Sequence, residues 1–110
     1  MAQPTDSPMQ LVAMSGVASA SKTVFNNPLS LNARSATIFN NDASVAITVS
    51  TDSTGSPSIS IAHGASQTFT LSGIVLDATD GTIVNGWSSG QLMFYVSGAV
   101  TTQPTVLVAA

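Results

Sequence analysis

The chain has 110 residues, 44% of them apolar but only 5% aromatic, and a formal net charge of -3. Asp, Glu, Lys and Arg make up 6% of the residues, against about 25% in an ordinary soluble domain. Two basic residues are too few to contact phosphates or anionic lipids, so we expect no nucleic acid and no membrane as partners. So little charge is typical of a chain covered by neighbouring molecules, and the alternative is a neutral, hydroxyl-coated secreted module.

Cysteine is absent, which excludes disulfides and thiolate metal sites and fits folding in a reducing cytoplasm. The N-terminal residues show neither the basic region nor the apolar region of a secretory signal. No apolar run approaches the roughly 20 residues of a membrane-spanning helix. We therefore expect one domain that is made and folded in the cytoplasm.

Residues 1–8 are polar and contain Pro4 and Pro8, whose rings favour extended backbone. This composition predicts an extended N-terminal arm, followed by a single β-sandwich domain over residues 9–110. The arm is either a frayed terminus or a segment that lies across a neighbouring subunit, with Met9, Leu11, Val12 and Met14 as its anchor.

Weak alternation over residues 9–14 and a short pattern over residues 22–25 predict the first two strands. Residues 35–71 are more regular, because apolar residues alternate there with small or hydroxylated ones and turn signals separate the segments. The apolar positions are Val45, Ile47, Val49, Ile59, Ile61, Phe69 and Leu71. We expect these three consecutive strands to form an antiparallel meander.

Residues 74–76 predict a short apolar strand, and residues 77–90 are the longest irregular segment. Residues 91–97 predict a strand that is apolar on both faces, and residues 105–109 predict the closing strand. Eight or so short strands at regular spacing indicate an all-β fold, an antiparallel two-sheet β-sandwich of jelly-roll or Ig-like (immunoglobulin-like) topology. The sequence leaves both topologies open.

Few residues can carry chemistry. His63 is the only histidine and lies beside Gly64 in a predicted turn. Asp77 and Asp80 share a loop and could bind Ca²⁺ weakly, but such pairs more often serve hydrogen bonds within a turn. We therefore expect no enzyme, no cofactor and no metal site.

Trp87, the only tryptophan, has two alternative interpretations. Exposed in its Gly/Ser loop, it would stack on a sugar ring or enter a pocket of a partner. Folded inward, it would close the end of a small sandwich.

Residues 35–71 combine a short strand ending in Asn, a polar turn, V-x-I-x-V, a Ser/Thr/Gly turn, I-x-I and x-G-x-S-x-T-F-x-L. This pattern resembles small β-sandwich proteins of tailed bacteriophage virions, particularly capsid decoration (cement) proteins. Related sandwiches often have Pro-Gly in the second turn, where this chain has His63-Gly64, and bacterial Ig-like modules share the pattern.

The resemblance implies a non-enzymatic virion structural protein on the capsid surface, assembled in the host cytoplasm. It would bind the major capsid protein as a homo-oligomer, a dimer or trimer, and brace adjacent capsomers. The candidate partner-binding residues are Pro4, Pro8, Met9, Leu11 and Trp87. The alternative is a receptor- or carbohydrate-binding module of a tail fibre, spike or adhesin, with residues 77–90 and Trp87 as its contact.

Overall fold

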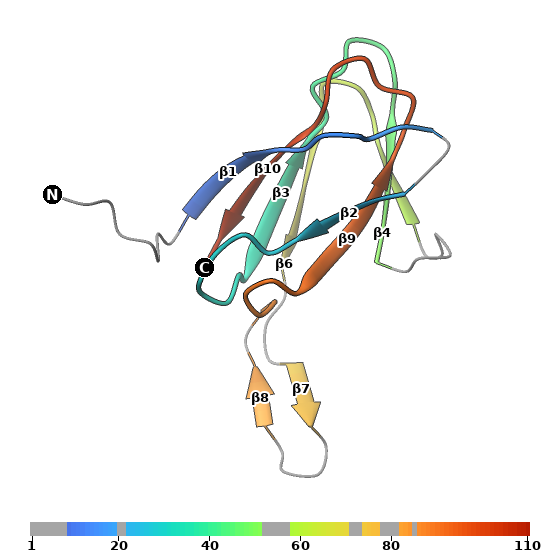
Figure 1. Ribbon diagram of the computed structural model, residues 1–110. Helices are drawn as coiled ribbons and strands as arrows, with labels where there is room; N and C mark the ends of the chain where they lie inside the picture. Colours follow the sequence, from blue (N-terminus) through green and yellow to red (C-terminus); the bar gives the residue numbers. More distant parts are fainter. Residues whose placement is uncertain (1–8, 20–21, 52–57, 71–73, 78–81, 85) are drawn as a thin grey trace, which may run out of the picture.

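The computed structural model describes residues 9–19, 22–51, 58–70, 74–77, 82–84 and 86–110, with 74–77 and 82–84 as backbone only. These residues form ten β-strands and no helix: β1 (Met9–Ala13), β2 (Thr23–Asn26), β3 (Ser35–Phe39), β4 (Ile47–Ser50), β5 (Ser58–Ile61), β6 (Ser66–Thr70), β7 (Ile74–Asp77), β8 (Thr82–Val84), β9 (Leu92–Ser97) and β10 (Thr105–Ala109). Eight of the strands form two four-stranded antiparallel sheets, while β7 and β8 form a separate hairpin at one end (Figure 1). The predicted all-β, two-sheet sandwich is confirmed. The predicted arm, with Pro4 and Pro8, lies outside the described residues.

The strand order identifies the topology. Sheet A has the order β1-β10-β3-β6, and sheet B has the order β2-β9-β4-β5. With the β7–β8 hairpin set aside, the strands pair from the ends of the chain inwards: β1 with β10, β2 with β9, β3 with β6 and β4 with β5. This is an antiparallel ribbon folded over on itself, the jelly-roll arrangement. An immunoglobulin-like sandwich distributes its strands differently, so the jelly roll is the correct alternative.

The expected three-stranded meander is wrong. β4 and β5 do form a hairpin, but β6 crosses to sheet A and pairs with β3. Backbone hydrogen bonds of 2.9 Å join Asn40, at the end of β3, to Ala65 and Gly64 in the turn after β5. These bonds hold the turn at the end of sheet A, so the next strand starts there.

Residues 77–90 are less irregular than expected, because β8 lies within them and pairs with β7. The three residues of β8, Thr-Ile-Val, are all β-branched and favour extended backbone. Trp87 also forms an isolated antiparallel bridge with Ala33. The segment is therefore tied to the sandwich at its C-terminal end.

The core lies between the two sheets and contains mainly aliphatic residues. Its buried apolar members are Met14, Val17, Phe25, Leu29, Ala33, Ala36, Ile38, Ile47, Val49, Ile61, Trp87, Met93, Phe94, Val96, Val106 and Val108. The rings of Phe25 and Phe94 stack with their centroids 5.2 Å apart, and Phe69 from sheet A lies 5.9 Å from Phe94. These aromatic contacts add to the area burial that stabilises the sandwich.

A β-bulge in β9 explains why two consecutive residues of this strand are buried. Phe25 pairs with Phe94, whereas Asn26 pairs with Leu92, so Met93 is the extra residue. A bulge interrupts the strict alternation of faces. Met93 and Phe94 both join the core for this reason, whereas strict alternation predicted opposite faces for them.

Two buried asparagines fix the chain where β2 and β3 end. The Asn27 side chain donates to the carbonyls of Leu31 and Trp87, both at 3.0 Å, and accepts from the Leu29 N–H. The Asn40 side chain donates to the carbonyls of Val45, at 2.9 Å, and Ile61, at 3.0 Å. A buried amide that satisfies several backbone groups holds loops in one arrangement.

Candidate functional site

The outer face of sheet A is the most distinctive surface of the described chain. Because side chains alternate along each strand, the register places three rows of four residues on this face. The rows are Met9-Ala109-Ser35-Thr70, Leu11-Leu107-Thr37-Thr68 and Ala13-Thr105-Phe39-Ser66. We call these twelve residues the sheet A face. It contains no charged residue, and five of its six apolar members lie on β1 and β10, while the sixth, Phe39, lies on β3.

The β1 end of the sheet A face is strongly exposed. Leu11 is 63% exposed and Met9 is 55% exposed, the two highest values among the large apolar residues of the described chain. β1 is an edge strand, with β10 as its neighbour in the described part of the sheet. It carries no charge, proline or bulge, the devices that usually prevent an edge strand from pairing with another chain.

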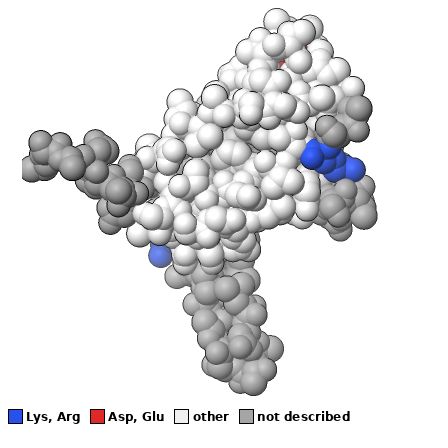
Figure 2. Space-filling model, in the orientation of Figure 1, with Lys and Arg blue, Asp and Glu red and all other residues white. Residues whose placement is uncertain are grey.

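The described part of the surface carries little charge. Lys22 and Arg34 are the exposed charged residues among those whose side chains are described, since Asp42 is buried. On the face seen in Figure 2, the described residues show two small patches of Lys and Arg at the margins and almost no other charge. Contacts made through this surface therefore depend on shape, apolar area and hydroxyl groups.

Asp42 is a structural carboxylate between two loops. Its Oδ1 accepts from the backbone N–H groups of Thr101, at 2.7 Å, and Thr102, at 3.0 Å. Its Oδ2 accepts from the N–H groups of Ser44, at 3.1 Å, and Val45, at 2.9 Å. These backbone hydrogen bonds, of which that from Thr102 has the largest effect, hold the pKa of Asp42 well below its usual range, although burial acts in the opposite direction.

The described residues hold no cluster with the composition of a metal site. No three His, Cys, Asp or Glu side chains lie together among them, and His63 is exposed in the turn between β5 and β6. Asp80 and the side chain of Asp77 lie outside what the structure describes. None of the described segments forms a helix that is long and apolar enough to cross a membrane.

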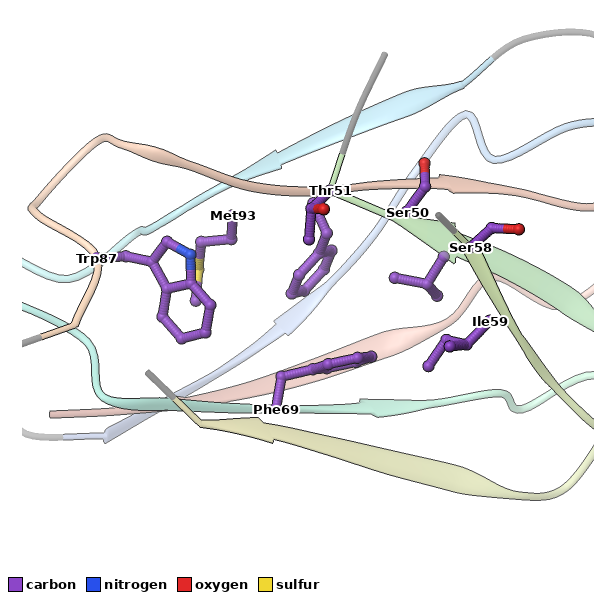
Figure 3. A pocket seen from close by; sticks show the side chains of 9 residues that line it. Ser50, Thr51, Ser58, Ile59, Phe69, Trp87 and Met93 are labelled. Carbon is purple, nitrogen blue, oxygen red and sulfur yellow. The ribbon is translucent and has the colours of Figure 1, made fainter. Parts of the chain in front are cut away.

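Trp87 is folded inward, the second of the two alternatives given above, since the residue is only 8% exposed. It lines a cavity of about 140 Å³ between the two sheets. The described lining residues are Val49, Ser50, Thr51, Ser58, Ile59, Phe69, Trp87, Met93 and Phe94. In Figure 3, Trp87 lies at one end of the cavity and Ile59 at the other, with Phe69 opposite Thr51.

The structure separates the predicted partner-binding residues into different surfaces. Met9 and Leu11 lie on the sheet A face, whereas Trp87 lies between the sheets beside the cavity. The residues that the sequence prediction missed are the neighbours of Leu11, above all Leu107, because strand pairing is not readable from alternation alone. The cavity was missed for the same reason, since it is lined by residues of several strands.

Comparison with protein-family models, with curated proteins and with solved structures gives no match to this chain. The class that the observations define is an all-β jelly-roll domain with an uncharged sheet face and an apolar cavity. One fold serves many unrelated functions, so a function has to be argued from these two features.

Proposed function

We propose that this chain is a virion structural protein, a capsid decoration (cement) protein that binds the outer surface of an icosahedral phage head and bridges its capsomers. The observation that carries the proposal is the uncharged sheet A face, which ends at the exposed edge strand β1. Exposed Met9 and Leu11 cost free energy in a solitary monomer, whereas burial against a neighbour stabilises the assembly.

The size of the sheet A face fits a lattice better than a free dimer. The face is four strands wide, at about 4.8 Å per strand, and five residues long, at about 3.4 Å per residue. Its area is therefore roughly 300 Å². A stable interface between two free proteins buries roughly 800 Å² on each partner. One such contact is therefore weak, but many copies on a repeating shell gain avidity.

Two partners follow from this proposal. The major capsid protein would cover part of the sheet A face, and further copies of this chain would complete a homo-oligomer. Residues 1–8, with Pro4 and Pro8, would extend from β1 across a neighbouring subunit, because β1 begins at Met9 and the arm leads directly into it. Main-chain pairing at the β1 edge would add affinity without requiring charge.

The alternative, a receptor- or carbohydrate-binding module, is less well supported. It relies on Trp87 as a contact, and a tryptophan with 8% exposure does not offer a ring face to a sugar at the surface.

Binding to particles tests the proposal through a pair of matched variants. Leu11→Asp places a carboxylate in the sheet A face, and Val24→Asp places one on the outer face of sheet B, where Val24 is 46% exposed on edge strand β2. We expect Leu11→Asp to lower co-sedimentation with particles freed of this protein by about tenfold or more, because a charge would be buried unpaired. Val24→Asp should bind as the wild type does. Equal binding by all three proteins would contradict the proposal.

A further inference from the structure

The cavity beside Trp87 has the size and the lining of a small-molecule site. Six of its nine described lining residues are apolar, and none is charged. The hydroxyl groups of Ser50 and Ser58 point away from Phe69 and Trp87 (Figure 3), so these two residues do not make the interior polar. An engineered cavity of about 150 Å³ with a similar apolar lining binds benzene, and this cavity measures about 140 Å³.

The indole N–H of Trp87 supplies a hydrogen-bond donor at the end of this cavity. No described residue accepts a hydrogen bond from it. Every fully buried side-chain nitrogen or oxygen of the described residues has a partner, so the indole nitrogen reaches accessible space. Trp87 is one of the residues that line the cavity, so the cavity is accessible space next to its ring.

We propose that this cavity binds an uncharged molecule about the size of a six-membered ring that carries one carbonyl-type oxygen, with the Trp87 N–H donating to that oxygen. The apolar ring would pack between Phe69 of sheet A and the sheet B residues Val49, Ile59 and Phe94. No described lining residue is charged, so this part of the lining fits an uncharged ligand and offers no counter-charge to an ion. This site goes beyond the proposed assembly function and does not depend on it.

Water competes poorly for this space. A buried water requires about two to four polar partners. Among the described lining residues, the polar groups that are not turned away from the cavity are the Trp87 N–H and the Thr51 hydroxyl. A ring that satisfies the N–H and covers the apolar wall therefore gains both a hydrogen bond and apolar burial.

Two probes of the same shape separate these contributions. Cyclohexanone carries the acceptor oxygen, and methylenecyclohexane replaces that oxygen with a CH₂ group. The chain has one tryptophan, so ¹⁵N-labelled protein gives a single indole cross-peak that reports directly on the cavity. We expect cyclohexanone to shift this cross-peak downfield to saturation and to bind about fivefold more tightly than methylenecyclohexane. An unmoved cross-peak, or equal affinity for the two probes, would overturn the proposal.

Two variants complete the test. Trp87→Phe keeps an aromatic ring without the N–H, so the fivefold preference should disappear, as followed by the backbone amide signals of Ile59 and Phe69. Ile59→Phe should fill the cavity and abolish binding of both probes, while Val24→Phe, on the outer face of sheet B, should leave it intact. If Trp87→Phe fails to fold, the pair Ile59→Phe and Val24→Phe still decides where the probes bind. Binding that survives Ile59→Phe would place the probes elsewhere and reject the site.

Discussion

Asp42 accepts hydrogen bonds from both the backbone N–H and the hydroxyl of Thr101, at 2.7 and 3.1 Å. The two residues are 59 positions apart. Their contact joins the β3–β4 connection to the β9–β10 connection, and so fastens one sheet to the other at this end of the sandwich. The jelly roll is held here by an ionised carboxylate among backbone donors rather than by an ion pair.

This arrangement predicts that acid destabilises the protein through Asp42. Its pKa is depressed in the folded state, so below about pH 4 the unfolded chain binds a proton that folded Asp42 does not. The free energy of unfolding should therefore fall as the pH is lowered from about 5 towards 2. Thermal unfolding across this range measures the effect.

Asp42→Asn is the matched control. It places a side-chain NH₂ against backbone N–H donors, so we expect a lower Tm at pH 7 and a flatter dependence on pH than in the wild type. An unchanged acid slope in Asp42→Asn would show that other carboxylates cause the loss.

Asn40→Asp should be strongly destabilising. The substitution removes the donor that satisfies the carbonyls of Val45 and Ile61, and it buries a negative charge beside them. We expect the free energy of unfolding to fall by about 3 kcal/mol at neutral pH. Asn26→Asp, at the exposed end of β2, should change it by less than about 0.5 kcal/mol. Urea denaturation measures both values, and similar losses in the two variants would contradict the role given to Asn40.

Gly86 is required by a close approach of two backbones. A Cβ at this position would lie 1.9 Å from the carbonyl oxygen of Ala33, and the residue has a φ of 94°. Gly86→Ala should break the Ala33–Trp87 bridge, whose two hydrogen bonds measure 2.7 and 2.8 Å, at a cost of about 3 kcal/mol or more.

Gly90→Ala is the control for backbone strain alone. Gly90 also has a positive φ, 76°, but no atom lies within 4 Å of the added Cβ. We expect it to cost about 1 kcal/mol. If Gly90→Ala were as damaging as Gly86→Ala, the close approach to Ala33 would not be the cause.

Deleting residues 1–8 separates the two candidate functions. Under the decoration proposal, the deletion lowers co-sedimentation with particles by about tenfold, because each copy loses its contact with a neighbour. Trp87→Phe leaves co-sedimentation unchanged, since Trp87 lies between the sheets. A receptor- or carbohydrate-binding module would show the reverse in a glycan-binding assay.

Alternation along the chain was enough to predict the sandwich and most of its strands, but not β8, which lies in the segment predicted to be irregular. Val49 and Ile61 are buried as the pattern predicted, and residues 105–109 form the closing strand. The β4–β5 hairpin was predicted, but pairing between strands that are distant in sequence was not predictable from alternation. The crossing of β6 to sheet A is fixed by bonds from Asn40 to Gly64 and Ala65, which no local pattern encodes.

The candidate surfaces were likewise predictable only in part from the sequence. The sequence pointed to Met9 and Leu11 through their position next to a proline-containing segment. It did not reveal that Leu11 lies opposite Leu107, because that requires the register of β1 on β10. The inward position of Trp87 likewise depends on the bridge to Ala33 and on the space that Gly86 leaves.

The most direct test of the central claim is the number of copies of this chain per purified particle, counted by quantitative mass spectrometry. The account predicts a copy number comparable to that of the major shell protein, because a decoration protein occupies a repeating lattice. A handful of copies would indicate a tail or spike module instead. Absence from every particle would contradict the virion assignment altogether.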